Sequence, residues 1–257
     1  MQSCVKMDYI RVRLLQGENG MVYVMSDVHG LFDKYSAMLA RIAFTETDTL
    51  YVLGDVLDRG PDGFRIMLDM ARRPNVVGLL GNHEMMAASL LPVLLRVMRR
   101  DDDGELSAAE RKRFNIWLRN GGQPSILQFL QLGDDEIGII FRYIGQLPIC
   151  REAVVGDGRF VLVHAGLEGF SVGRPLTDYG PEDCLFCRPA PETVYFQDRM
   201  VVLGHTPTRL FYQLAGVGRK IDRIFYRPTW IGIDCGCACS GGRLGCLCLD
   251  TMEEFYV

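Results

Sequence analysis

Short apolar runs alternate with amphipathic segments over the first third of the chain. Residues 31–43 have the spacing of a helix, as does the segment that Pro61 opens and Arg72-Arg73-Pro74 ends. Strands and helices in alternation predict a parallel sheet, in which the carboxyl ends of the strands meet at one edge. The three strands expected here are residues 21–25, 48–53 and 75–80.

The pattern becomes helical from residue 84 onward. Ser107 and Glu110 form a capping box at the start of one helix, and Asn120-Gly121-Gly122 ends it. We interpret residues 84–146 as a helical insert. The helices expected within it are one long amphipathic helix over 84–100, one over 108–119, and two within 124–146.

From residue 149 the alternation is typical of strands. A Gly-Asp-Gly turn between two apolar runs predicts a hairpin over 149–163, and residues 167–198 look irregular. We interpret the second half as a second sheet packed on the first, and the whole chain as a single domain, residues 1–257. The other strands expected are a weak edge strand at 9–15, a strand at 200–203, and short strands around 222–227, 230–234, 243–249 and 252–257.

Composition narrows the class of protein. The chain has 257 residues, 48% of them hydrophobic and 23% charged, which is ordinary for a globular protein. A net charge of -4 gives no reason to expect a nucleic-acid partner. No stretch has the apolar length of a transmembrane helix, and the start does not resemble a signal peptide. Nine cysteines indicate reduced thiols, so we expect a cytoplasmic protein without a membrane partner.

The polar residues after the predicted strands have the composition of a metal site. All four histidines lie in short turns that contain Gly or Ala, three of them directly after an apolar run. One metal ion needs only three or four protein ligands, whereas six mixed N and O donors suit two divalent ions, most readily Mn, with Fe or Zn as alternatives. Asp55, on the middle strand, can bridge the two ions. The six expected ligands are Asp27, His29, Asp55, Asn82, His164 and His205.

Three further residues in these turns suit phosphoryl transfer. Arg59 follows the bridging carboxylate by four residues and can hold phosphate oxygens with a bidentate guanidinium. His83 is next to the ligand Asn82 and cannot easily share its metal, so it is free to act as general acid. Asp58 is the natural partner that would keep His83 protonated and oriented.

The motifs SDVHG, GDVLDRG, GNHE, HAG and GHTP, in this order, resemble those of the binuclear metallophosphoesterases. Within that superfamily they are similar to PPP-type serine/threonine phosphatases, in the bacterial and bacteriophage branch. The resemblance covers roughly residues 20–250. Asn120-Gly121-Gly122 and Ile233-Asp234-Cys235-Gly236 also match the bacterial pattern.

The resemblance implies a fold and a division of the ligands. The fold is α/β, an αββα four-layer sandwich of two mixed sheets flanked by helices, here with the helical insert. One ion takes Asp27, His29 and Asp55, and the other takes Asp55 and three further ligands, namely Asn82, His164 and His205. The resemblance also implies that substrate phosphate contacts Arg59, a second arginine expected to be Arg188, Asn82 and His83.

From these residues we expect a metal-dependent phosphomonoesterase in which a metal-bridging hydroxide attacks phosphorus directly. The leading interpretation is a protein serine/threonine phosphatase, whose partner would be a phosphorylated protein or a small phosphate ester. The alternative enzyme is a dinucleoside polyphosphate hydrolase of the diadenosine tetraphosphate type. The alternative outside enzymes is a phosphate-sensing binding protein. No regulatory partner is indicated by the sequence.

The cysteines allow two interpretations. Cys184 and Cys187 form a C-x-x-C beside Arg188, which raises the hypothesis of redox control of the phosphate pocket. Five others crowd the C-terminal strands, where small apolar filler is favoured over a structural zinc because C-x-C pairs lack the usual spacer. These five are Cys235, Cys237, Cys239, Cys246 and Cys248.

Overall fold

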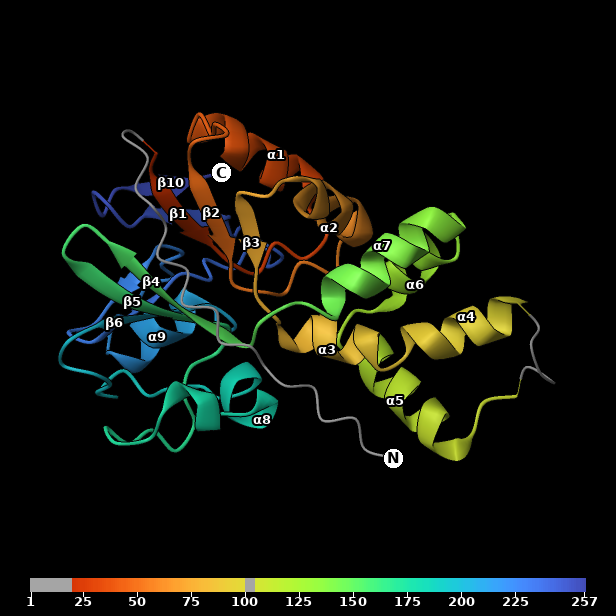
Figure 1. Ribbon diagram of the computed structural model, residues 1–257. Coiled ribbons are helices and arrows are strands. Elements are labelled where there is room, and N and C mark those ends of the chain that lie inside the picture. Colours follow the sequence, from red (N-terminus) through yellow and green to blue (C-terminus); the bar gives the residue numbers. More distant parts are fainter. Residues whose placement is uncertain (1–19, 100–104) are drawn as a thin grey trace.

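Two five-stranded sheets pack face to face in the computed structural model, which describes residues 20–99 and 105–257. Figure 1 shows helices on the outer face of each sheet and a group of helices at one side. This arrangement confirms the α/β sandwich of two mixed sheets. The edge strand expected at 9–15 lies outside the described residues. That the chain is a single domain stays a prediction.

The first sheet contains the three strands expected from the N-terminal pattern. Parallel pairing joins β1 to β2 and β2 to β3, so the carboxyl ends of all three lie at one edge. The second half forms a second sheet packed on the first, as expected, except that its last two strands return to the first sheet beside β1. The order is β10 (Glu254–Tyr256), β9 (Gly245–Cys248), β1 (Val22–Met25), β2 (Thr49–Val52), β3 (Val76–Gly78).

Alternate side chains of the first sheet face opposite cores. Met25 and Val52 pack under helices α1 (Phe32–Arg41) and α2 (Gly63–Arg72) on the outer face. Val24 faces the second sheet, as the period of two along a strand requires. Both helices cover the same face, and the two crossovers, from β1 to β2 through α1 and from β2 to β3 through α2, bring the three strand ends to one edge.

The second sheet lies behind the first and presents its own strand ends to the same region. β5 and β6 are parallel, as are β6 and β8, whereas β4 and β7 are antiparallel edge strands. Its outer face packs against α8 (Pro181–Leu185), α9 (Thr208–Leu214) and the segment before α8, which includes a short 3-10 turn, η1 (Leu176–Asp178). The order is β4 (Cys150–Val155), β5 (Gly158–Val163), β6 (Met200–Leu203), β8 (Trp230–Gly232), β7 (Phe225–Tyr226).

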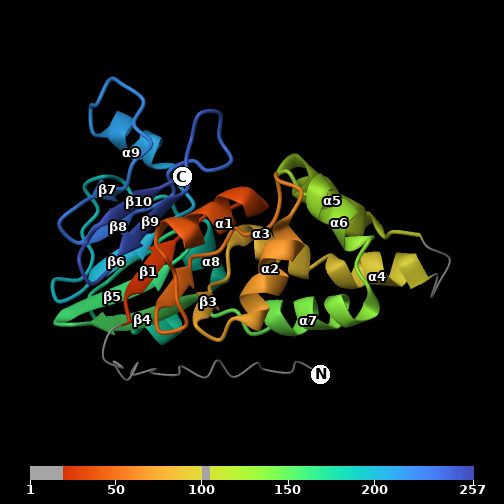
Figure 2. The same ribbon diagram turned by 90° about the horizontal axis from the view of Figure 1, so that it is seen from above.

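The helical insert packs beside α2 around its own apolar core. Figure 2 shows it extending to one side of the two sheets. The expected long helix over 84–100 is wrong, since the chain turns at Ser89–Leu90 between two shorter helices. Pro92 explains the break, because it has no N–H to bond back to Ala88 and fits only a helix's first turn. The helices are α3 (Asn82–Ala88), α4 (Leu91–Arg99), α5 (Ala108–Arg119), α6 (Gln123–Phe129) and α7 (Asp134–Ile144).

The clustered cysteines are divided between two cores. Cys235 lies in the core between the sheets, whereas Cys237, Cys246 and Cys248 lie under α1. Cys235 and Cys237 are only two residues apart, yet they lie in different cores. In the described residues, the two groups of side chains that could share a metal ion contain no cysteine. Burial also raises the pKa of Cys237 to about 12, so these thiols favour the packing interpretation.

Over residues 20–99 and 105–257, no helix combines the length and the apolar character needed to cross a bilayer. The cytoplasmic location stays a prediction.

Candidate metal centre and active site

Five turns after the strands bring the predicted ligands together. Hydrogen bonds between backbone groups join the turns after β1 and β2: Asp27 N–H donates to the Gly54 carbonyl at 3.1 Å, and His29 N–H to the Asp55 carbonyl at 2.9 Å. The turn after β6 is held in the same way, since Gly204 N–H donates to the His164 carbonyl at 2.7 Å. Ligand atoms of Asp55, from the first sheet, and of His164 and His205, from the second, lie within 4.8 Å of one another, so the strand ends of both sheets form one cluster.

The backbone of these turns is strained at the functional positions. A side chain with positive φ crowds its own backbone, so a non-glycine residue is rarely found there, and such strain concentrates at sites of function. Eight non-glycine residues of the described chain have positive φ, and two of them, Ala43 and Met252, lie outside the candidate site. The other six are Asp27, His29, Asp55, Asp58, Arg59 and His205.

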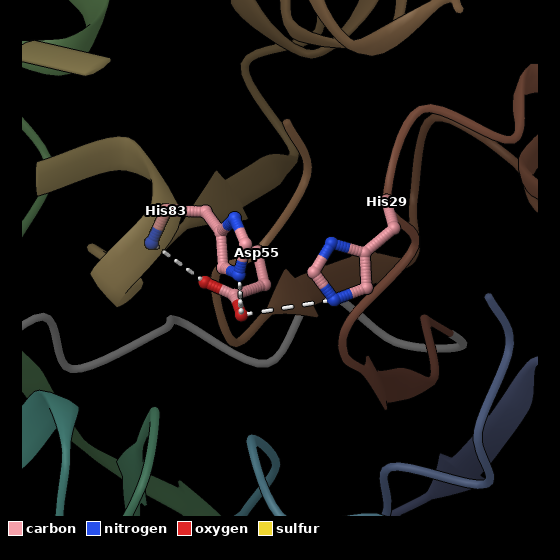
Figure 3. Close-up of side chains that lie close together, drawn as sticks. All are labelled: His29, Asp55 and His83. Carbon is pink, nitrogen blue, oxygen red and sulfur yellow. Dashed lines mark hydrogen bonds and ion pairs between the residues drawn. The ribbon is translucent and has the colours of Figure 1, made fainter. Parts of the chain in front are cut away.

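Asp55 lies between two groups of potential ligands. Its Oδ2 is 3.8 Å from His29 Nε2, and its Oδ1 is 3.4 Å from His164 Nε2 (Figure 3 shows the His29 side). Two donors that bind one ion at about 2.1 Å lie about 3.0 to 3.5 Å apart, so these distances are close to those of ligand pairs. The carboxylate thus presents one oxygen to each group, an arrangement in which it can bridge two ions.

Two imidazoles have a nitrogen left for a metal ion. His29 Nδ1 lies 3.0 Å from the Leu57 carbonyl, and His164 Nδ1 lies 2.7 Å from the Leu53 carbonyl. A carbonyl oxygen can only accept a hydrogen bond, so Nδ1 carries the proton and donates in both residues. Nε2 therefore keeps a lone pair, which faces Asp55. Asn82 Oδ1 is 2.9 Å from His164 Nε2, just below the separation of two ligands of one ion.

Burial sets the charge of the cluster. It lowers the pKa of His29 and His164, and burial together with His164 and Arg188 lowers the pKa of His205 to about 2. Neutral imidazoles are the form that binds a metal ion. Burial raises the pKa of the Asp55 carboxyl, which shows that this buried anion needs cations around it. The donor set therefore fits a pair of divalent ions.

Asp27 links the two sheets across the site. Its Oδ2 accepts the backbone N–H of His205 at 2.9 Å and a short hydrogen bond from the Ser26 hydroxyl. Its Oδ1 faces His29 Nε2 at 3.9 Å. Gly204 is required beside this pair because a Cβ there would overlap both the Ser26 hydroxyl and the Asp27 carboxylate.

His83 and Asp58 form the buried pair that the sequence predicts. His83 Nδ1 lies 2.6 Å from Asp58 Oδ2, and its Nε2 faces the cluster, 3.7 Å from Asp55 Oδ2 and 3.4 Å from Arg59 Nη2. His83 is close enough to Asp55 and His29 to join a metal site. Burial lowers the pKa of His83, but Asp55 and the hydrogen bond to Asp58 outweigh it and raise the pKa overall. A protonated imidazole cannot bind a metal ion, so a charged His83 would be a proton donor and not a ligand.

The helical insert holds Asp58 in place, a role that sequence analysis missed. Trp117 Nε1, on α5, donates to Asp58 Oδ2 at 2.8 Å, and the Ser125 hydroxyl, on α6, donates to Asp58 Oδ1 at 2.6 Å. Between the helices, the Gly121 carbonyl accepts the Arg59 N–H at 2.9 Å. The Asn-Gly-Gly motif in the sequence marks this contact, but nothing in the sequence connects Trp117 or Ser125 to Asp58.

Glu84 was also missed as a site residue, although it ends the GNHE motif. Its buried carboxylate accepts the backbone N–H groups of Asp55, Val56 and Leu57 at 2.7, 2.8 and 3.0 Å. It therefore fixes the turn that carries Asp55 and Arg59. Burial and the Asp55 charge raise the pKa of Glu84 to about 7, which is the electrostatic cost of this arrangement.

Arg188 lies at the margin of the site. Its side chain is exposed and its Nη1 donates to Thr206 Oγ1 at 3.0 Å, next to His205. Its charge lowers the pKa of His205. Contact with substrate phosphate stays a prediction for this residue. Cys184 and Cys187, nearby, are buried, and burial raises the pKa of Cys187 to about 12, which weighs against a reactive thiol.

A family profile decides the class to which this site belongs. The profile of the calcineurin-like phosphoesterases matches residues 20–226, most of the chain and all six candidate metal ligands. The chain belongs to the calcineurin-like phosphoesterase family. Its ligand groups fit the binuclear divalent metal centre of this family.

Two curated relatives are symmetrical bis(5'-nucleosyl)-tetraphosphatases. The chain is 33% identical over 130 residues to a symmetrical bis(5'-nucleosyl)-tetraphosphatase of Delftia acidovorans, which is 49% of this chain and 45% of that protein. It is 30% identical over 153 residues to the same kind of enzyme from Acidovorax sp. (strain JS42), covering 57% and 44%. The chain thus spans about half the length of the curated relatives it matches. These relatives favour the alternative function over the protein phosphatase.

Solved structures agree on the fold. A structure provisionally named a diadenosine tetraphosphatase aligns with a TM-score of 0.64 over 95% of both chains at 21% identity. A protein serine/threonine phosphatase from Saccharomyces cerevisiae aligns with a TM-score of 0.56 over 90% of this chain and 73% of that one, at 13% identity. At such identities the likeness is one of fold alone, and it covers the sheets and the helices of this phosphoesterase.

Proposed function

We propose that this chain hydrolyses the polyphosphate bridge of dinucleoside tetraphosphates, with two divalent metal ions in the cluster around Asp55. The observation that carries the proposal is the Asp55 carboxylate, whose two oxygens face different ligand groups at 3.8 and 3.4 Å. The curated relatives support the choice of substrate. A dinucleoside tetraphosphate also satisfies the expectation of a small phosphate substrate.

The proposed ligands are those named from the sequence, divided into two sets that share Asp55. Bound ions would supply Lewis acidity that activates water and neutralises charge on the phosphate. Mn is our first choice, since mixed N and O donors suit it, with Fe or Zn as alternatives. One set is Asp27, His29 and Asp55, and the other is Asp55, Asn82, His164 and His205.

The remaining residues bind phosphate and supply a proton. Arg59 directs its guanidinium toward the cluster and would hold the nonbridging oxygens of the phosphate that is attacked. Arg188 would hold the neighbouring phosphate, and the Asn82 amide would contact that neighbouring phosphate as well. His83, oriented by its hydrogen bond to Asp58, would give its Nε2 proton to the departing oxygen.

Product analysis tests the proposal. The purified chain is incubated with Mn and diadenosine tetraphosphate, and the nucleotides are separated by ion-exchange chromatography. Cleavage at the centre yields two molecules of ADP, which is the expected result. AMP with ATP would mean asymmetric cleavage and would overturn the symmetrical assignment. If the chain hydrolyses p-nitrophenyl phosphate but not diadenosine tetraphosphate, the proposed substrate is refuted and the proposed phosphate hydrolysis stands.

A phosphomonoesterase, the protein phosphatase included, is the second candidate. The His83–Asp58 pair favours it, because an alkoxide leaving group requires a proton more than a phosphate leaving group does. Turnover of phosphoserine peptides in preference to diadenosine tetraphosphate would support this candidate. A chain that binds Mn and phosphate but turns over neither substrate would be a phosphate-sensing protein instead.

A further inference from the structure

A cavity of about 350 Å³ opens beside Arg188, outside the cluster of metal ligands. Its walls come from the segment after the His164 turn and from the segment that follows Arg188. Its volume is at the lower end of the range of small-molecule sites, about 300–1,000 Å³. The residues that matter below are Leu167, Glu168, Phe170, Arg188, Val194 and Tyr195.

The cavity is joined to the candidate active site by two short connections. Leu167 follows His164 by three residues, and Arg188 lines the cavity while its Nη1 contacts Thr206, the neighbour of His205. The turn between His164 and Leu167 packs against Tyr195, a lining residue, since a Cβ at Gly166 would lie 2.9 Å from the Tyr195 hydroxyl oxygen. A phosphate held by Arg188 would therefore have its next substituent at the mouth of the cavity.

The walls combine a fixed aromatic ring with exposed apolar surface. Phe170 meets the rings of Tyr195 and Phe196 edge to face, at centroid distances of 5.2 and 4.8 Å, so its own orientation is fixed while it remains partly exposed. Val194 is 60% exposed. A flat, partly exposed ring beside apolar surface suits stacking of a nucleobase.

The charges around the cavity favour binding of a nucleoside there over binding of a further phosphate. The exposed carboxylate of Glu168 lines the same cavity and would repel a second phosphate there. It can instead accept hydrogen bonds from ribose hydroxyls or from a base amino group. Arg188, at the other side, supplies the positive charge for the phosphate that joins the nucleoside.

We propose that this cavity binds one nucleoside of the substrate, with Arg188 holding the phosphate attached to it. The proposal rests on the dinucleoside tetraphosphate hydrolase proposed above and adds the residues that would recognise the nucleoside. Phe170 stacks on the base, Val194 covers its edge, and Glu168 accepts from the sugar or the base.

The test compares a substrate that has a nucleoside with one that has none. Phe170→Leu keeps most of the apolar volume and removes the flat ring. The ratio of kcat/KM for diadenosine tetraphosphate to kcat/KM for p-nitrophenyl phosphate should fall by about 5- to 150-fold, the loss of one base–aromatic stack. Phe170→Trp should restore the ratio. Val172→Ala is the matched control, because Val172 is 81% exposed in the same segment and should leave the ratio unchanged.

A second measurement does not need the dinucleotide as substrate. AMP and inorganic phosphate are compared as inhibitors of p-nitrophenyl phosphate hydrolysis by the wild-type and Phe170→Leu chains. The inhibition constant of AMP should rise in the variant relative to that of inorganic phosphate. Unchanged ratios in both measurements would overturn the cavity assignment while leaving dinucleotide hydrolysis intact. A third outcome would be that the wild-type chain cleaves no dinucleotide but AMP inhibits it less well once Phe170→Leu is introduced. That outcome would refute the proposed substrate and support the cavity.

Discussion

Trp117 and Ser125 offer the sharpest test of how the helical insert contributes to catalysis. Trp117→Phe removes one hydrogen bond to Asp58, the 2.8 Å bond from Nε1. Ser125→Ala removes two, because its hydroxyl donates to the Asp58 carboxylate at 2.6 Å and accepts the Asp58 N–H at 2.9 Å. Both changes release Asp58 and with it the position of His83, while neither residue is among the candidate metal ligands.

The magnitude follows from the charge on the acceptor. A hydrogen bond to a charged group contributes about 1.5–3 kcal/mol. If all of it is expressed when the leaving oxygen takes its proton, Trp117→Phe slows that step by about 10- to 150-fold. Ser125→Ala should cost at least as much. Removing the general acid itself would cost about 10²- to 10⁴-fold, which sets the upper limit.

The assay is a series of aryl phosphates with leaving groups of graded basicity. A nitrophenolate departs without a proton, so its turnover should change little, whereas phenyl phosphate needs the proton and should show the full loss. Trp230→Phe is the control, because the Trp230 indole is also buried but donates to the Thr193 carbonyl, away from Asp58. An equal loss across the series, or no loss with phenyl phosphate, would refute the positioning role.

Four other results are expected. Asp55→Asn should abolish turnover and reduce bound Mn by at least one ion per chain in elemental analysis, because the bridging charge is lost; full metal content would refute a bridge. His83→Asn should slow turnover with metal retained, and loss of metal would instead make His83 a ligand. Gly204→Ala should lower the melting temperature and weaken Mn binding, since its Cβ overlaps Asp27; a neutral result would show that the turn can shift. The pKa of His83 is raised above 6.5, so kcat for phenyl phosphate should persist at neutral pH and fall as pH rises through that raised value. In Asp58→Asn the decrease of kcat should begin at lower pH. An unchanged pH profile would show that the decrease does not come from His83.

The local parts of the fold could be predicted from the sequence because local patterns encode them. The alternation of apolar runs and helices predicted β1, β2 and β3, and turns rich in charge after the strands predicted the cluster. A capping box predicted the start of α5, which Ser107 and Glu110 form as expected. In each case the information lies within about ten residues of chain.

What depends on distant partners was missed. The pairing of β9 with β1 joins residues more than two hundred positions apart, and an apolar strand does not specify its neighbour. α9 was missed because a seven-residue helix has too few turns to show its period. Trp117 reads as an ordinary core residue until the fold places its N–H against Asp58. The helix break near Pro92 could have been predicted from the proline, but the long amphipathic pattern around it favoured one continuous helix.

Metal location tests the central assignment most directly. A crystal of the wild-type chain soaked in Mn and measured at the manganese absorption edge should show two anomalous peaks, about 3.5–4 Å apart, one on each side of the Asp55 carboxylate. His29 Nε2 should contact one ion and His164 Nε2 the other. A single peak, or two peaks away from Asp55, would contradict the two-metal account.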